Sequence, residues 1–202
     1  IRLNVLAAST LVTQALISYK KDHDGLHFRL IQNSQCEDAD ITVFTRENFQ
    51  IPADTKERYE LFKERIFLAV PHNSPYASEE SVRLQDFAHE DFISLSGSRS
   101  IRTICDRYCM QAGFVPHIIY ESDSPDTVKN LIASGLGVGF WPHYTWGMDS
   151  MEQIRLLPIA EPTCQRAIIL QLHRHARGQE AVCSFYAFLN RYLRQLKAAE
   201  QH

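Results

Sequence analysis

One stretch, residues 124–142, carries the signals for a complete helix-to-strand unit at both of its ends. Ser124 suits a helix N-cap, Pro125 the first helical position, and Asp126 the positive end of the helix dipole. Gly135 follows where a helix stops in a left-handed conformation, and Pro142 ends a strand. The apolar positions are Val128, Leu131 and Ile132 in the helix and Val138, Phe140 and Trp141 in the strand. The stretch predicts half of an α/β layer.

Three glycines in this stretch, Gly135, Gly137 and Gly139, raise the question of a nucleotide site. A dinucleotide-binding fingerprint runs in the order strand, glycines, helix, so that the helix N-terminus faces the phosphates. Here the order is helix, glycines, strand. The glycines therefore indicate a tight helix-to-strand turn and not a phosphate-binding loop.

The bulk composition excludes several classes of protein. The chain has 202 residues, of which 45% are hydrophobic and 22% charged, as in globular domains. No run of apolar residues is long enough to span a membrane. A net charge of -3 gives no basic field for a phosphate backbone, so any DNA contact has to come from another part of the protein. The first residue is Ile1 and not Met, so we expect a fragment of a longer chain.

The five cysteines are odd in number and form no Cys-x-x-Cys pair, which favours neither a disulfide framework nor a zinc site. This usage points to a reducing cytoplasm. Cys105 and Cys109 share the apolar face of a predicted helix, where core packing is expected. Cys36 lies in a polar stretch, and a redox-sensing thiol stays open for it.

The hydrophobic periodicity predicts alternating strands and helices along the whole chain. The predicted strands span residues 2–6, 26–32, 39–44, 65–70, 91–95, 117–120, 138–141, 154–159 and 167–172. The predicted helices span residues 9–19, 84–89, 101–112, 125–134 and 178–200. The apolar face of the last helix is Phe185, Leu189, Tyr192, Leu193 and Leu196.

A polar stretch rich in Ser, Pro and Asn, residues 72–80, is the best linker in the chain. We therefore expect an α/β protein of two lobes, with residues 1–70 and 166–202 in the first and residues 71–165 in the second. Two crossing strands would form the hinge between them. Folds of this class bind ligands in a cleft outside the carboxyl ends of their strands.

Hydroxyl side chains mark three strand-to-helix junctions, at Ser9 and Thr10, at residues 98–100 and at residues 122–124. A helix start leaves backbone N–H groups unpaired and carries partial positive charge, so several such starts around one cleft would bind a carboxylate or a similar anion. The alternative is that these residues only cap their helices.

Two arginines are candidates for an anion clamp. Arg46 directly follows the predicted strand 39–44, and a solvated surface position is its alternative. Arg102 follows the 98–100 turn, but it lies one helical turn from Asp106 and is equally suited to pair with that carboxylate.

No catalytic or cofactor motif stands out, since nucleophile-elbow, Walker and zinc-protease patterns are all absent from the sequence. His173 and His175 fall on one strand face without a third metal ligand in view, which favours a solvated strand end. We expect neither an enzyme nor a metal or cofactor protein.

The order of motifs resembles the effector-binding domain of LysR-type transcriptional regulators over essentially the whole chain. The resemblance rests on the opening strand with Ala8-Ser9-Thr10, residues 40–43 (Asp-Ile-Thr-Val), residues 69–71 (Ala-Val-Pro), Arg102 with Asp106 before residues 111–113 (Gln-Ala-Gly), and the stretch with Gly135, Gly137 and Pro142.

The resemblance implies two Rossmann-like lobes as in type 2 periplasmic binding proteins, a small-molecule effector in the inter-lobe cleft, and an N-terminal winged helix-turn-helix that this chain lacks. It further implies a cytoplasmic protein that forms homodimers or tetramers, with the faces of residues 11–19 and 26–30 turned towards a partner subunit; burial of both faces within one chain is the alternative. By matching position, the effector contacts are Ser9, Thr10, Gln32, Asn33, Thr45, Arg46, Ser98, Ser100, Ser122 and Ser124.

One departure from the family concerns the second and third strands, between which the family carries a helix of two to three turns. Only residues 33–38 are available here. Either the helix is absent or a segment has been left out of the sequence. A solute-binding protein of a transporter shares the fold and is the alternative function; the odd cysteine count and the lack of a signal segment count against it.

Overall fold

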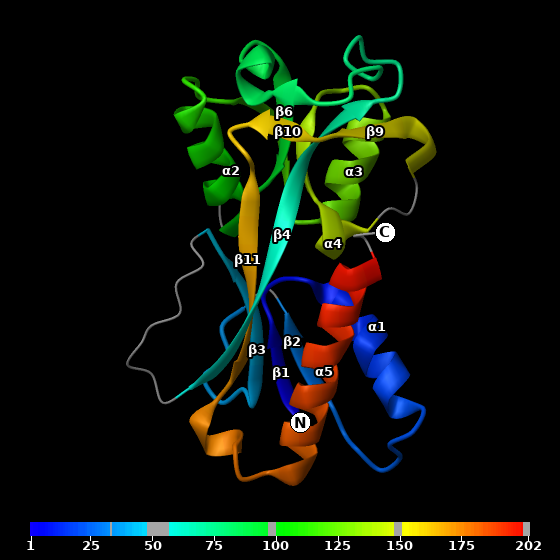
Figure 1. Ribbon diagram of the computed structural model, residues 1–202, viewed down its shortest axis with the longest axis vertical. Helices are drawn as coiled ribbons and strands as arrows, with labels where there is room; N and C mark the ends of the chain where they lie inside the picture. Colours follow the sequence, from blue (N-terminus) through cyan, green and yellow to red (C-terminus); the bar gives the residue numbers. More distant parts are fainter. Residues whose placement is uncertain (33, 48–56, 97–99, 148–150, 200–202) are drawn as a thin grey trace. The chain divides into compact units, whose positions relative to one another are not determined.

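The computed structural model describes residues 1–32, 34–47, 57–96, 100–147 and 151–199. It divides the chain into two compact units (Figure 1): unit 1 is Ile1–Lys63 with Ala167–His202, and unit 2 is Glu64–Arg166. The chain passes between the units within β4 (Arg58–Pro71) and again within β11 (Gln165–Leu172). The sequence analysis places the first boundary after residue 70, next to the polar stretch. In the structure it falls between Lys63 and Glu64, because β4 is one continuous strand of 14 residues.

Unit 1 is built on a short parallel sheet of β2 (Arg29–Gln32), β1 (Arg2–Val5) and β3 (Ile41–Arg46), in that order. β1 pairs with both neighbours, and β11 runs antiparallel beside β3. The predicted strand 26–32 begins only at residue 29, because β1 begins at Arg2 and its register pairs Arg2 with Arg29.

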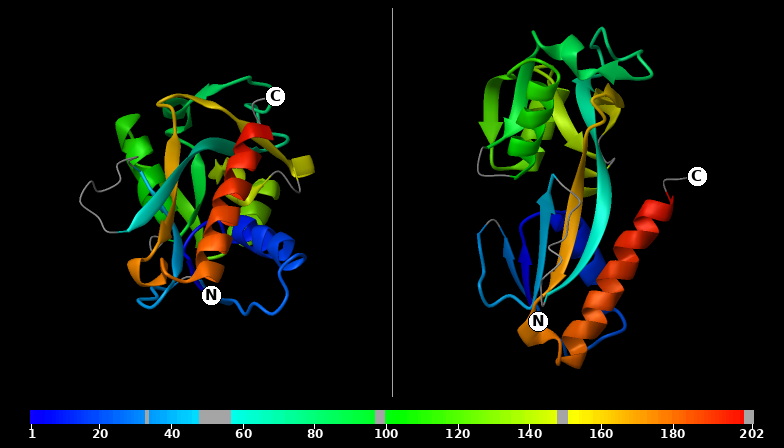
Figure 2. Two further views of the ribbon diagram at one scale, coloured as in Figure 1. Left: turned by 60° about the horizontal axis from the view of Figure 1, so that its bottom comes forward. Right: turned by 60° about the vertical axis from the view of Figure 1, so that its left-hand side comes forward.

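Two helices, α1 (Ser9–Lys20) and α5 (Glu180–Ala199), lie side by side on this sheet (Figures 1 and 2), and the 3₁₀ turn η3 (Arg174–Ala176) precedes α5. The Tyr19 hydroxyl donates to the hydroxyl of Ser184 at 2.9 Å, and the Tyr19 ring packs edge-on against Phe185. The apolar face predicted for α1 is therefore buried within unit 1 and is not available to a partner subunit. The buried residues of that face are Leu11, Val12, Ala15 and Tyr19. None of the described helices has the length and apolar character needed to cross a membrane.

The connection from β2 to β3 contains no helix among its described residues, 34–40, which form only turns and bends. This agrees with the short connection noted in the sequence. The connection is anchored at its end by Arg2, whose guanidinium pairs with Asp38 at 2.6 Å and with Asp40 at 3.0 Å. The carboxylates thus fix the chain before β3 begins.

Unit 2 contains three sets of paired strands. The second half of β4 pairs antiparallel with β8 (Gly139–Pro142) and β9 (Ile154–Leu157). β6 (Asp91–Leu95) pairs in parallel with β7 (His117–Ser122), and β5 (Val82–Arg83) with β10 (Ile159–Glu161). The single strand predicted over residues 154–159 is thus two strands, interrupted at Pro158, which has no N–H to donate. The helices of this unit are η1 (Leu84–Phe87), α2 (Ser100–Gln111), α3 (Pro125–Ala133), α4 (His143–Trp146) and η2 (Met151–Gln153).

Three glycines lead from the end of α3 into β8, one required by its backbone conformation and two by close packing. Gly135 stops α3 with a φ of 79°. A Cβ on Gly137 would lie 2.6 Å from the carbonyl oxygen of Asp91, and one on Gly139 would lie 2.8 Å from that of Ile93. The turn therefore brings the chain against β6, where only hydrogen fits in place of a side chain.

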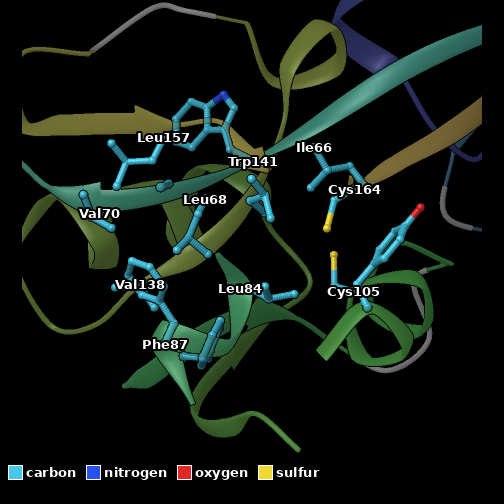
Figure 3. Close-up of a cluster of buried hydrophobic side chains, with 14 of the residues drawn as sticks. Ile66, Leu68, Val70, Leu84, Phe87, Cys105, Val138, Trp141, Leu157 and Cys164 are labelled. Atoms are coloured by element: carbon cyan, nitrogen blue, oxygen red, sulfur yellow. The ribbon is translucent and has the colours of Figure 1, made fainter. Parts of the chain in front are cut away.

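The core of unit 2 gathers side chains from β4, η1, α2, β8, β9 and the turn before β11 (Figure 3). Cys105 and Cys109 are buried in it, which confirms the core packing predicted for them, and Cys164 is buried with them. Burial raises the pKa of Cys109 and of Cys164 to about 12 each. All three thiols are free and protonated at neutral pH.

Candidate effector-binding edges

In unit 1, the carboxyl ends of the three parallel strands meet at one edge of the sheet. Gln32, Val5 and Val43 stand in register across β2, β1 and β3. Thr45 and Arg46 follow on β3, and α1 starts just beyond β1. The structure therefore brings five predicted contacts to this edge, while Asn33 lies outside the described residues. The five are Ser9, Thr10, Gln32, Thr45 and Arg46.

The start of α1 is not capped by a side chain. Its N-cap is Ala8, which adopts a left-handed conformation with φ 59° and ψ 33° and makes no side-chain cap bond. Ser9 is half-buried and Thr10 exposed, and both belong to the first helical turn. The cap-only interpretation therefore fails for these two hydroxyls. The left-handed conformation costs a residue with a Cβ about 1–3 kcal/mol in conformational free energy, and such strain concentrates at functional sites.

Thr45 and Arg46 point to opposite faces of β3, as alternation along a strand requires. Thr45 is buried, whereas Arg46 is exposed. The Arg46 guanidinium lies over the ring of Phe44, 5.3 Å from its centroid. This stacking positions an exposed guanidinium, as an anion clamp requires.

In unit 2, the parallel strands β6 and β7 end at a second edge. The Ser96 backbone N–H donates to the Ser122 carbonyl at 2.9 Å and extends the pairing. Ser122 Oγ accepts from the Ser124 N–H at 3.1 Å, and Ser124 Oγ accepts from the Thr127 N–H at 3.4 Å. Both hydroxyls thus hold the start of α3, and the predicted N-cap at Ser124 is confirmed.

The start of α2 is described from Ser100 onward; Ser98 lies outside the described residues. Ser100 is exposed at the first helical position. Arg102 is not available as an anion clamp, because its Nε lies 2.7 Å from Asp106 Oδ2 and its Nη1 pairs with Glu121. The ion pair with Asp106 is the alternative that the helical spacing suggests.

Beneath this edge lies a small cavity of about 10 Å³, close to the volume that one water molecule needs. Among the described lining residues Ser94 carries the one hydroxyl, and apart from the Cys105 thiol and the Trp146 indole the other side chains are hydrocarbon, so the described lining is mostly apolar. The lining residues are Ile93, Ser94, Leu95, Ile101, Cys105, Val128, Phe140 and Trp146.

His173 and His175 are held by hydrogen bonds and are not free at a strand end. His173 Nε2 lies 2.8 Å from Thr42 Oγ1, and His175 Nε2 lies 3.3 Å from Asp40 Oδ1. Burial lowers the pKa of His173. Among the described residues, no three metal-ligating side chains come together.

Cys36 is the predicted candidate for a redox-sensing thiol, and its surroundings disfavour that role. Its Sγ donates to Asp38 Oδ1 at 3.0 Å, and this hydrogen bond raises the pKa of the Cys36 thiol. The reactive thiolate is therefore suppressed.

The sequence analysis missed a polar cluster inside unit 2. Glu64 is fully buried, and its Oε2 accepts from Arg166 Nε at 2.6 Å. Glu64 Oε1 accepts from the Thr145 N–H at 2.7 Å, and Arg166 Nη2 donates to Thr145 Oγ1 at 2.7 Å. The available signal is weak: Glu64 alternates with the buried residues Phe62 and Ile66, and Arg166 is the one charged residue of β11. The helix α4 has no signal in the sequence.

Comparison with known proteins identifies the family. The LysR substrate binding domain matches residues 1–194. The transcriptional dual regulator GltC of Bacillus subtilis (strain 168) is 25% identical over 200 residues, which are 94% of this chain and 65% of GltC. This chain thus spans less than two thirds of the length of the curated relatives.

Solved structures of the same family share the fold. The effector binding domain of QuiR in complex with shikimate superposes with a TM-score of 0.76 at 19% identity, covering 96% of this chain and 97% of that one. The regulatory domain of CcmR from Synechocystis PCC6803 in complex with 2-PG gives a TM-score of 0.80 at 16% identity, covering 94% and 95%. The predicted periplasmic-binding-protein-like α/β fold is confirmed by these similarities. The chain belongs to the LysR substrate binding domain family.

Proposed function

We propose that this chain is the ligand-sensing domain of a bacterial LysR-type transcriptional regulator and that its effector is a small organic anion. Its relatives are transcriptional regulators and not enzymes. QuiR and CcmR were solved with small molecules, shikimate and 2-PG. The proposal extends to this chain the kind of ligand that those two domains hold.

The observation that carries the proposal is the edge of unit 1 at which α1 begins. An uncapped helix start, with Ser9 and Thr10 in its first turn, lies at the same edge as Arg46, whose guanidinium is oriented by Phe44. Backbone N–H groups, hydroxyls and one guanidinium are the donors that bind a carboxylate or a phosphate. Gln32 and Thr45 add polar groups to this edge.

Unit 2 offers fewer candidate side chains of its own. Ser100 and Ser98 are its proposed hydroxyl contacts. Ser122 and Ser124 are engaged in the α3 turn, so a ligand there would meet the helix start that they organise. We therefore expect Ser122→Ala and Ser124→Ala to weaken binding less than Arg46→Ala does.

A thermal-shift screen tests the proposal with organic acids, amino acids, sugars and nucleosides as probes. A ligand at about a hundred times its dissociation constant stabilises by about 2.7 kcal/mol, which shifts the melting temperature by several degrees. We expect organic acids to be the hits and Arg46→Ala to abolish their shifts. The matched control is Arg29→Ala, which removes an exposed arginine at the opposite end of β2. An effector class without negative charge, or an acid whose shift survives Arg46→Ala, would exclude the anion site.

The whole regulator is proposed to act through a shift in the population of two conformations that its effector binds unequally. DNA would be read by an N-terminal winged helix-turn-helix outside this chain, in a cytoplasmic homodimer or tetramer. The exposed side of α1, with Ile17, is the proposed subunit contact, because its apolar face is already buried. Light scattering on the chain and on Ile17→Glu tests this contact; we expect a dimer that the substitution dissociates, and a wild-type monomer at high concentration would exclude it.

A further inference from the structure

The short helix α4 is fastened on two sides within unit 2. It has only four residues, a single turn that has no stability of its own in water. Its position is therefore set by the groups that hold it. One set of contacts comes from α3 and the other from the two strand segments at which the chain enters and leaves unit 2.

Lys129 makes the contact from α3. Its Nζ donates to the Trp146 carbonyl at 2.9 Å and lies 5.3 Å from the ring centroid of Trp141 and 5.9 Å from that of Trp146. The Lys129 side chain is only about one fifth exposed, at 21%. A charge-assisted hydrogen bond and two cation–π contacts in this half-buried position join the end of α4 to the middle of α3.

Glu64 and Arg166 make the contact from the crossing strands. Glu64 accepts from the Thr145 backbone N–H, and Arg166 donates to the Thr145 hydroxyl, each at 2.7 Å. Glu64 is the first residue of unit 2 and Arg166 the last. Because all three residues are buried, these bonds have no water to exchange with, and a shift of α4 requires a shift of both strands.

We propose that α4 couples α3 to both crossing strands, β4 and β11. A ligand that displaces the start of α3 then also displaces β4 at Glu64 and β11 at Arg166, the points where the chain passes to unit 1. The link to a ligand rests on the proposed function; the coupling itself is a property of unit 2. Lys129, Thr145, Glu64 and Arg166 are positioning residues in this scheme.

Hydrogen exchange measured by mass spectrometry on the whole chain tests the coupling without any effector. Lys129→Met keeps the aliphatic stem on the indoles and removes the donor. We expect faster amide exchange in α3, in residues 143–147 and in residues 64–70, by about 2- to 30-fold, the range of a coupling of 0.5–2 kcal/mol. Lys129→Arg, which keeps a donor and the charge, should restore slow exchange in residues 64–70.

Two control variants separate coupling from simple loss of stability. Val128→Ala enlarges the cavity under the same helix but removes none of the hydrogen bonds that hold α4, and Asp126→Asn removes the exposed partner that lies 3.7 Å from Lys129. Val128→Ala should raise exchange evenly over unit 2, and Asp126→Asn should leave residues 64–70 unchanged. The coupling is excluded if Lys129→Met affects α3 alone, or if its exchange pattern matches that of Val128→Ala. Either result leaves the ligand screen and the proposed function untouched.

Discussion

Glu64 and Arg166 form an ion pair in which 0% and 5% of the two side chains are exposed, although the residues are 102 positions apart in the sequence. They stand at the two points where the chain changes units. Each carboxylate oxygen has a donor, one from Arg166 and one from the Thr145 backbone. The pair is thus well hydrogen-bonded, which is the condition under which a buried charge is tolerated.

Removing one partner of this pair should cost far more than removing both. Arg166→Met leaves the Glu64 carboxylate buried with a single donor, and we expect a loss of about 3–5 kcal/mol in the free energy of unfolding. Glu64→Met combined with Arg166→Met should recover most of that loss, because no buried charge remains. Urea unfolding measures both. A double variant as unstable as Arg166→Met would contradict this, because the loss could then not come from the uncompensated charge of Glu64.

Gly137→Ala should destabilise unit 2, because the new Cβ would meet the Asp91 carbonyl oxygen at 2.6 Å, and this backbone oxygen cannot turn aside as the end of a flexible side chain can. Overpacking of this kind costs about 1–3 kcal/mol. Gly178→Ala is the control, since its Cβ would have no neighbour within 4 Å. Thermal denaturation should show a lower melting temperature for Gly137→Ala than for the unchanged protein, and no decrease for Gly178→Ala. If Gly137→Ala melts at the same temperature as the unchanged protein, the turn accommodates the new Cβ by moving.

Ser124→Ala should remove the bond from the Thr127 N–H that caps α3. A lost cap costs about 0.5–2 kcal/mol, and the 3.4 Å distance here places the cost at the lower end. Ser134→Ala, at the other end of α3, removes a hydroxyl that donates to the Asn130 carbonyl and serves as the comparison. Chemical denaturation of both variants should show the larger loss in the free energy of unfolding for Ser124→Ala. An unchanged free energy of unfolding for Ser124→Ala would show that the cap does not stabilise the protein.

Much of the fold can be predicted from the sequence because its signals are local. The α3 unit is the clearest example: its cap at Ser124, its stop at Gly135 and the strand closed by Pro142 are all decided within a few residues. The helical period around Cys105 and Cys109 is decided in the same way. Strand ends are harder to predict, because pairing decides them. β4 begins seven residues earlier than predicted, at Arg58, where no hydrophobic pattern marks it.

The candidate site is predicted less completely, because hydrogen-bond partners come from distant parts of the chain. The hydroxyl-rich turns look alike in the sequence, yet Ser124 caps its helix while Ser9 follows an N-cap at Ala8. Arg102 and Arg46 are equally plausible clamps until Glu121, 19 residues away, is seen to pair with Arg102. The Glu64–Arg166 pair is beyond any local pattern, because its two residues are 102 positions apart and Glu64 is one of five charged residues in β4.

His173 should make the stability of the chain depend on pH below neutrality. Burial lowers the pKa of His173 in the folded state, with the charges of Glu57 and Asp40 opposing this in part, so the unfolded chain binds its proton more readily. The free energy of unfolding should therefore fall as pH drops from about 7 through the unfolded value of about 6.5 and towards the lower folded pKa. His173→Gln should flatten this decrease while keeping a polar partner for Thr42, and His89→Gln, at an exposed position, should not. Urea unfolding at pH 7.5 and pH 5.5 measures the difference; an equal decrease in all three proteins would assign it to other groups.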